Sequence, residues 1–228
     1  MDIIFIEIID FLEHITMDQL HLTTHKNRKQ YKSKLDGFYS LNTSTLNNPF
    51  CKKMFSSAID DLICIDCYAK TLEKRYFYKT DKLNVNANIL SGSILLWDHV
   101  PFYPLLSVLR IHSLGELIND AHFINVILIA KKNSHCTVSI WTKRPDIVKR
   151  VFKSGYSKPD NLILIYSNPR VNCDFEIKPP EFFNKVFNNY TKHFAEENNV
   201  DINCHKSCKD CLLCYTHNGV EQIKELVK

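Results

Sequence analysis

Apolar and polar residues follow one another along the middle of the chain in a pattern typical of strand–helix repeats. Three apolar runs, at residues 107–112, 136–142 and 161–167, have the length and composition of buried strands. Residues 117–131 and 144–153, which lie between these runs, carry apolar side chains at helical spacing. The run at 161–167 is almost entirely apolar, as expected of a parallel strand buried on both faces. The pattern therefore predicts βα repeats that form a parallel sheet.

The flanking segments extend this pattern in both directions. Residues 38–43 are predicted to be the first core strand, and helices are predicted over 68–78 and 82–96. Beyond the repeats, a helix is predicted over 180–194 and a short helix at the C-terminal end. Residues 1–13 fit either a helix or a short buried strand. We expect an α/β fold in which the strands form a partial or complete (β/α) barrel.

Composition favours one globular domain with small additions at both ends. The chain has 228 residues, of which 45% are hydrophobic, enough to bury a sizeable core. We expect an N-terminal extension over 1–36, an α/β core domain over 37–195, and a Cys-rich segment over 196–228 packed on the core as an appendage. No apolar segment is long enough to span a bilayer, and the apolar N-terminal stretch has no basic region before it. A cytoplasmic protein without membrane contact is expected.

Four cysteines near the C-terminal end carry the strongest chemical signal. They are spaced x3, x2 and x2, at Cys204, Cys208, Cys211 and Cys214. Thiols this close in sequence can converge on zinc or on an iron–sulfur cluster, and in a reducing compartment metal ligation is favoured over disulfides. His205 and His217 flank the run as alternative ligands. The sequence therefore predicts a metal centre.

A second group of cysteines lies earlier in the chain. Cys64 and Cys67 form a CxxC pair at the start of the predicted helix over 68–78, where the helix dipole lowers thiol pKa values and favours ligation. Twelve residues separate Cys51 from Cys64, enough for the chain to fold back and join the pair. Cys136 lies apart and is interpreted as buried packing. We expect Cys51, Cys64 and Cys67 to be metal ligands.

Polar residues recur where the predicted strands end. In parallel α/β sheets, ligands bind beyond the carboxyl ends of the strands. The polar residues at these ends are therefore candidates for binding a small-molecule cofactor: His112, Gly115, Glu116, Thr142, Lys143, Ser167 and Asn168.

The basic residues between positions 25 and 35 give a further candidate interface. The net charge of the whole chain is +4, a mild excess that permits contact with nucleic acid without requiring it. The run is either a solvated surface or a contact for nucleic acid or another anionic partner.

Several of these segments resemble the phage gene-product-88 family. Arg110-Ile-His112-x-x-Gly115-Glu116 resembles that family's Arg-Trp-His-x-Ser-Gly-Asp segment, and Cys67-Tyr68-Ala69 resembles its Cys-Tyr-Ala. Trp141-Thr142-Lys143 is similar to its aromatic-Thr-Lys strand end. The likeness covers roughly residues 37–170 and the C-terminal cysteines. It implies architecture more than activity.

The chain also looks like radical S-adenosylmethionine (SAM) enzymes, in which three cysteines hold a [4Fe–4S] cluster. The resemblance implies that Cys51, Cys64 and Cys67 hold the cluster and that Gly115-Glu116 lies beside SAM. That family's cysteines are spaced C-x3-C-x2-C, whereas the intervals in this triad are x12 and x2. The x3, x2 spacing occurs instead at Cys204, Cys208 and Cys211. Since 17 residues follow Cys211 in the sequence, that run is expected to be an auxiliary centre.

Three hypotheses remain open at this point. The first is an iron–sulfur enzyme with one open and one closed cluster, possessing radical-SAM-like chemistry on an unknown substrate. The second is a non-catalytic zinc protein that touches nucleic acid or a protein partner. The third is one shared site that joins all seven thiols.

Overall fold

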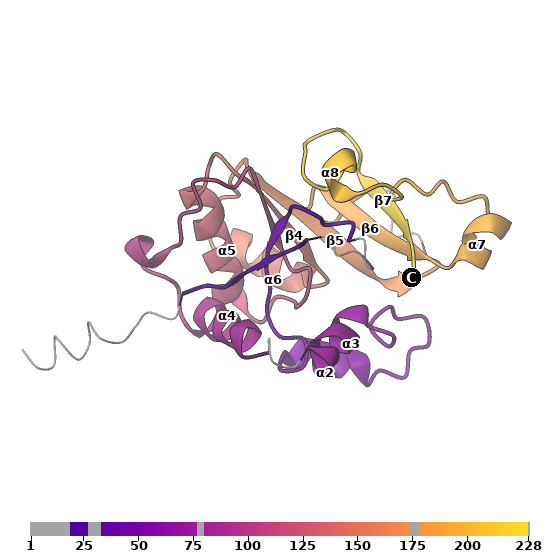
Figure 1. Ribbon diagram of the computed structural model, residues 1–228, viewed down its shortest axis with the longest axis horizontal. Coiled ribbons are helices and arrows are strands. Elements are labelled where there is room, and N and C mark those ends of the chain that lie inside the picture. The colour runs from indigo at the N-terminus through magenta and orange to yellow at the C-terminus, as the bar shows by residue number, and fades with distance from the viewer. Residues whose placement is uncertain (1–18, 27–32, 77–79, 174–177, 228) are drawn as a thin grey trace, which may run out of the picture.

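A computed structural model describes residues 19–26, 33–76, 80–173 and 178–227. It confirms the α/β class, because a seven-stranded sheet is interleaved with helices (Figure 1). The strands lie side by side in the order of the chain, with β1 antiparallel to β2 and all later neighbours parallel. The observed pairing runs from β1 at one edge to β7 at the other and does not include closure into a complete barrel.

The elements have the following bounds. The strands are β1 (Leu22–Thr24), β2 (Tyr39–Leu41), β3 (Val108–Ile111), β4 (Thr137–Thr142), β5 (Leu162–Val171), β6 (Lys185–Tyr190) and β7 (Gln222–Leu226). The helices are α2 (Pro49–Phe55), α3 (Tyr68–Arg75), α4 (Thr80–Gly92), the 3₁₀ helix η2 (Trp97–His99), α5 (Asp120–Lys132), α6 (Pro145–Lys153), α7 (Lys192–Glu197) and α8 (Cys208–Cys211).

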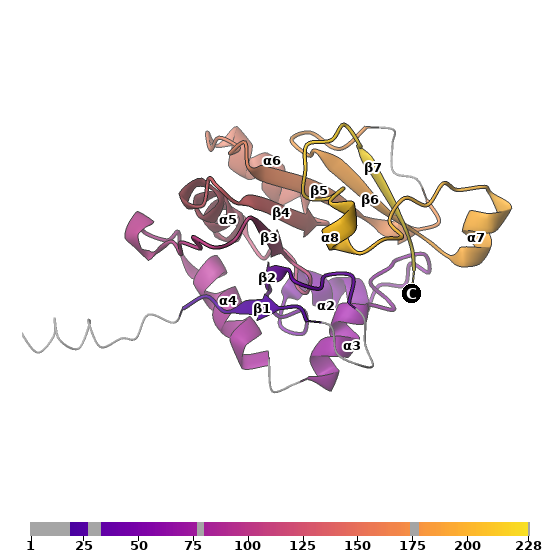
Figure 2. The same ribbon diagram turned by 45° about the horizontal axis from the view of Figure 1, so that its top comes forward.

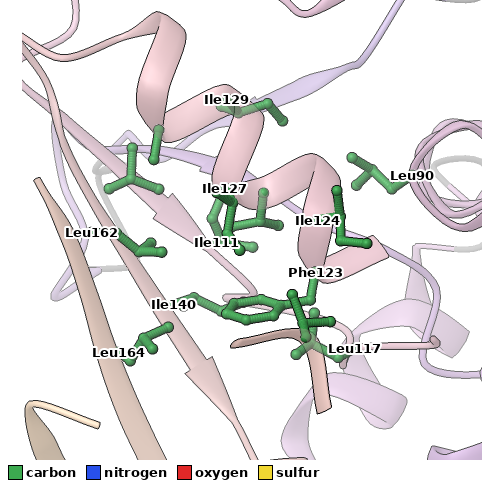
Figure 3. Close-up of a cluster of buried hydrophobic side chains, with 14 of the residues drawn as sticks. Leu90, Ile111, Leu117, Phe123, Ile124, Ile127, Ile129, Ile140, Leu162 and Leu164 are labelled. Carbon is green, nitrogen blue, oxygen red and sulfur yellow. The ribbon is translucent and has the colours of Figure 1, made fainter. Parts of the chain in front are cut away.

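The main core lies between the sheet and the crossover helices. The β3–α5–β4 and β4–α6–β5 connections move to the next strand in the same direction, and crossovers between parallel strands are normally right-handed, so α5 and α6 lie on one face. Phe123 and Ile127 of α5 are fully buried against Ile111, Ile140 and other residues of the sheet (Figure 3). This face therefore matches the predicted βα repeats.

The opposite face of the sheet is covered by the C-terminal segment. Alternate residues of β5 point to opposite faces of the sheet. Leu162 and Leu164 pack into the main core, whereas Ile163 and Ile165 pack into a second hydrophobic cluster on the other face. That second cluster includes Tyr215, and Figure 2 shows α8 in front of the sheet with α5 and α6 behind it. The cysteine-rich segment then adds β7 to the sheet beside β6, so it is built into the fold.

Two predicted helices are wrong. Within 180–194, Lys185–Tyr190 form β6, and the predicted C-terminal helix is instead β7. The β7 residues Gln222–Leu226 mostly suit a helix, but tertiary context overrides helix propensity, whereas the Val, Phe and Tyr of β6 suit a strand. Val186 and Ile223 are fully buried, and pairing of β6 with both neighbours satisfies its backbone.

Other differences are local. Residues 49–55, for which no helix was predicted, form α2, and the helix predicted over 82–96 ends at Gly92. The short strand β1 was not anticipated, because the residues around it are mostly polar. The prediction for 1–13 lies outside the described residues.

Among the described residues, no helix is both long enough and apolar enough to cross a membrane.

Candidate metal centres

The first candidate centre consists of Cys51, Cys64 and Cys67, which three separate segments bring to the carboxyl end of the sheet. Cys51 lies in the first turn of α2. Asn48 caps that helix by accepting hydrogen bonds from the backbone N–H groups of Phe50 (2.9 Å) and Cys51 (3.3 Å). The Nδ2 group of Asn48 also donates to the carbonyl of Glu116 (2.9 Å), which ties α2 to the loop after β3.

Cys64 is placed by a short antiparallel pairing with the far end of β5. The N–H of Ile63 donates to the carbonyl of Pro169 (2.9 Å), and the N–H of Val171 donates to the carbonyl of Asp61 (2.8 Å). Cys64 itself is 8% exposed. The pairing therefore fixes this thiol beside the carboxyl ends of the parallel strands.

Cys67 is the N-cap of α3, as the sequence predicted, and a buried carboxylate holds that helix in place. Glu73 of α3 is 2% exposed. Its carboxylate accepts hydrogen bonds from Ser44 Oγ (2.5 Å), Thr45 N (2.7 Å), Thr45 Oγ1 (2.6 Å) and Leu46 N (3.3 Å). These bonds join the Cys67-bearing helix to the loop between β2 and α2. Glu73 is thus a positioning residue that the sequence analysis did not single out.

The three thiols and Lys143 form one electrostatic group. Burial raises the pKa of the Cys51 thiol, and Glu116, Cys64 and Cys67 raise it further while Lys143 lowers it. Burial likewise raises the pKa of the Cys64 thiol, opposed by Lys143. Burial acts to lower the pKa of Lys143, but the three cysteines and Glu116 outweigh it and raise that pKa overall. Thiols with raised pKa values are poor free nucleophiles, whereas a bound metal would deprotonate them.

Glu116, Thr142 and Lys143 are brought together at the ends of β3 and β4. The Glu116 carboxylate accepts hydrogen bonds from Thr142 Oγ1 (2.5 Å), from the N–H of Lys143 (2.8 Å) and from the N–H of Leu117 (2.8 Å). The Nζ of Lys143 in turn donates to Ser167 Oγ (3.1 Å) in β5, one residue beyond the last β5 residue that pairs with β4. Glu116 therefore locks two strand ends together, and Lys143 faces the cysteines.

Gly115 permits a close contact between two strand ends. Its φ is +103°, and a Cβ atom at this position would lie 2.2 Å from Thr43 Oγ1 and 2.7 Å from the Thr43 carbonyl. Only glycine fits here without displacing Thr43, which follows β2 in the chain. The role that the structure gives Gly115 is close packing.

The remaining predicted cofactor residues are also buried at this edge. Asn168 is 2% exposed and donates to the carbonyl of Cys173 (2.8 Å) and to Asn188 Oδ1 (2.9 Å). His112 has a left-handed backbone (φ 64°), and its ring lies edge-on to the ring of His122 with 5.2 Å between centroids. In the described part of the chain, the Nε2 atoms of His112 and His122 are buried without a hydrogen-bond partner. Buried polar atoms of this kind normally have a partner, so a bound water or ligand fits this edge.

The second candidate centre is formed by the four C-terminal cysteines. They line one small pocket of about 10 Å³, the room needed for roughly one water molecule. Burial raises the pKa of Cys204 to about 11, and burial also raises the pKa of Cys214, with the other three cysteines adding to that shift. Cys208 begins α8, a helix of four residues. The four thiols thus converge on one place.

Elements distant in sequence hold this second centre. The N–H of Cys208 donates to the carbonyl of Lys34 (2.7 Å), and Lys34 Nζ donates to the carbonyl of Cys204 (2.8 Å) and to Glu225 (2.5 Å). Ser139 Oγ of β4 donates to the carbonyl of Cys214 (2.9 Å). Lys34, which belongs to the basic run over 25–35, therefore stabilises the fold around this centre. Residues 27–32 of that run lie outside the described residues.

The donor sets suit a soft metal, although the side chains are not arranged as ligands of a single ion. Within the residues that the structure describes, no three His, Cys, Asp or Glu side chains are placed as ligands of one metal ion. Thiolates of an iron–sulfur cluster bind different irons, so their sulfurs lie further apart than the ligands of one ion. All-sulfur sets select zinc or iron–sulfur clusters. On the chemistry of the donors, both centres fit a metal.

Cys136 is fully buried in the main core, which confirms its interpretation as packing.

Comparisons with known proteins add no family. No protein-family model, no curated protein and no solved structure matches the chain.

Proposed function

We propose that the chain is an iron–sulfur protein with two cysteine centres. Cys51, Cys64 and Cys67 would hold an open cluster at the carboxyl edge of the sheet. Cys204, Cys208, Cys211 and Cys214 would hold a closed one on the sheet face opposite the crossover helices. The observation that carries the proposal is the convergence of Cys51, Cys64 and Cys67 from three segments beside Lys143.

The difference in ligand number supports a division of roles. Three protein ligands leave a metal position open to a small molecule, which chemistry requires, whereas four close the centre and suit electron transfer or structural support. When bound, a cluster supplies single electrons to a molecule at its open iron. A radical-SAM-like reaction on an unknown substrate is the finer form of this proposal.

The residues around the open centre have definable tasks. The ammonium group of Lys143 offsets the negative charge that three thiolates bring to a partly buried site. Glu116 accepts hydrogen bonds from Thr142 and from the backbone N–H of Lys143, and these bonds fix the position of the Lys143 backbone. Tyr68, which follows Cys67, is 60% exposed and donates its hydroxyl to the carbonyl of Ser113 (2.6 Å), so its ring stands at the solvent side of the centre.

A non-catalytic zinc protein is the second candidate, and the four thiols that line one pocket at the C-terminal centre favour it. Sets of four thiolates are typical of structural zinc sites. In this case the four thiolates would be a structural knot. Removal of zinc by a chelator would then unfold the protein. Contact with nucleic acid through residues 25–35 would show as binding that weakens steeply with salt.

Paired cysteine variants test the proposal. The Cys64→Ser/Cys67→Ser variant, purified without oxygen, is expected to lose about four irons per chain and keep the second centre. Cys208→Ser/Cys211→Ser should show the reverse loss. Cys136→Ser is the matched control, because that thiol is buried away from both centres, and it should keep all the iron. Full iron content in the Cys64→Ser/Cys67→Ser variant would refute the open cluster.

A further inference from the structure

Arg110 is a cation that lies on the sheet beside the C-terminal cysteine centre. The side chain of Arg110 in β3 lies on the sheet face that the C-terminal segment covers, because its neighbours Leu109 and Ile111 point to the opposite face, into the main core. The carbon of its guanidinium lies 3.9 Å from the centroid of the Trp141 ring. Its Nη1 donates to Tyr215 Oη (3.4 Å).

Tyr215 connects this cation to a cysteine sulfur. Tyr215 and Cys208 line the same pocket, and the Tyr215 hydroxyl lowers the pKa of the Cys208 thiol, as a donor to its ionised sulfur does. Arg110 thus donates to the tyrosine oxygen, and the tyrosine hydroxyl is placed to donate to the ionised sulfur. Such a chain polarises the hydroxyl toward a negatively charged sulfur. Cys214, the residue before Tyr215, also lies within electrostatic range of Arg110.

Arg110 lacks an ordinary counter-ion. In the described part of the chain no carboxylate forms an ion pair with it, and its Nε is a buried donor without a partner. A second cation at the centre, Lys34, has its Nζ 3.7 Å from the sulfur of Cys204 but is already paired with Glu225 at 2.5 Å. Lys34 and Glu225 together add no net charge. Lys185 also lies within electrostatic range of Cys214, and its Nζ donates to Asn218 Oδ1 and to the Val220 carbonyl (2.7 Å each). Arg110 is thus a positive charge at this centre that no carboxylate of the described residues pairs with.

Buried charges need partners, and the thiols supply one only when they are ionised. Four neutral thiols leave Arg110 without any negative charge. Four thiolates around a metal unit of charge +2 carry a net charge of −2, which an arginine would offset in part. The guanidinium therefore matches the metal-loaded form of the centre and not the metal-free form.

We propose that Arg110, acting through Tyr215, is the counter-ion of the metal-loaded C-terminal cysteine centre and stabilises its thiolates. This inference rests on the proposed function, because it requires that the four cysteines hold a metal. Arg110 is a positioning and charge-balancing residue; it is not a ligand. The ligand class is a soft metal with a charge of about +2, as zinc or an oxidised [4Fe–4S] cluster provides.

Cobalt binding tests the inference without requiring activity. Every protein in this test carries Cys64→Ser/Cys67→Ser, so that the absorption comes from the four-cysteine centre. The reduced, metal-free protein is titrated with Co²⁺ without oxygen, and the cobalt–thiolate absorption is followed. Arg110→Gln is expected to raise the dissociation constant roughly 10–100-fold, the usual cost of losing a group that supports metal ligands. Arg110→Lys should retain most of the affinity, because it keeps the charge. Tyr215→Phe should weaken binding less than Arg110→Gln does.

A second readout separates charge balance from a purely structural role. If Arg110 is a counter-ion, Arg110→Gln should reduce the gain in melting temperature that Co²⁺ produces. A structural role would instead lower the melting temperature of the metal-free and the loaded forms alike and leave the gain unchanged. Arg150→Gln is the control, since Arg150 is 52% exposed and pairs with Asp120 and Asp146.

The outcomes distinguish the two proposals. If the protein with native Arg110 shows no thiolate absorption with Co²⁺, the four-cysteine centre itself is refuted, and the role of Arg110 with it. If that protein binds Co²⁺ and Arg110→Gln binds it within about twofold, only the role of Arg110 is overturned. If Arg110→Gln does not fold, the same decision is made on Tyr215→Phe, where unchanged affinity counts against the inference.

Discussion

The buried pair His112 and His122 should make the fold sensitive to mild acid. His112 is 4% exposed and His122 is fully buried. Burial lowers the pKa of His112 to about 3, and the nearby cations Arg110 and Lys143 add to the shift, opposed by the carbonyl of Trp141 near Nδ1. Burial also lowers the pKa of His122 well below its ordinary value, with His112 contributing.

The sign and size of the effect follow from linkage. An unfolded histidine binds a proton as pH falls below about 6.5, whereas folded His112 stays neutral until pH is near 3. Stability is therefore fully present above pH 6.5 and is lost progressively as pH falls toward 3. At pH 5, His112 alone should lower the free energy of unfolding by about 2 kcal/mol relative to pH 7 or above.

Urea unfolding at pH 7 and pH 5 measures this loss. His112→Asn removes the titrating group and keeps a residue that tolerates a φ of 64°. The variant should lose about 2 kcal/mol less than the native protein between the two pH values, whatever its stability at pH 7. His99→Asn is the control, because His99 is exposed and its removal should leave the loss unchanged. An equal loss in His112→Asn and the native protein would refute the reasoning.

Three further predictions concern the residues that build the first centre. Glu73→Gln should lower the free energy of unfolding by about 2–3 kcal/mol, since the Ser44–Leu46 loop loses a charged acceptor, and should reduce iron at the first centre; unchanged urea unfolding and metal content would contradict this. Gly115→Ala should destabilise by about 2 kcal/mol or more in thermal unfolding, because its Cβ would meet Thr43, while Gly92→Ala, in open space, should not. Lys143→Met should speed the loss of iron to a chelator from the first centre alone, and an unchanged rate would count against its charge-balancing role.

The sequence predicts most directly the strands and helices whose own side chains are mostly apolar. β5 is apolar on both faces, and α5 carries apolar residues on nearly every side, so the pattern reports the parallel sheet and its covering helix directly. β6 and β7 were missed because their residues are mixed. Lys185 and Asn188 are buried in β6, and the strand exists because β5 and β7 pair with it.

The cysteines were identifiable from spacing, whereas the residues that support them were not. Glu73 lies in a charged helix and resembles a surface residue, yet it bonds a loop 28 positions away. Lys34 belongs to a basic run but pairs with Glu225 across 191 positions. Such contacts depend on topology and leave no local pattern. One supporting feature has a local pattern: each centre has a cysteine followed directly by a tyrosine, Cys67-Tyr68 and Cys214-Tyr215.

The most direct test of the two-centre account is the metal content of the intact chain. The protein would be purified anaerobically, its absorption spectrum recorded, and iron, sulfide and zinc counted per chain. The account predicts a brown protein with a broad band near about 400 nm and about four to eight irons matched by sulfide. A colourless protein with about one zinc and no sulfide would contradict it and leave a structural zinc knot at the C-terminal cysteines.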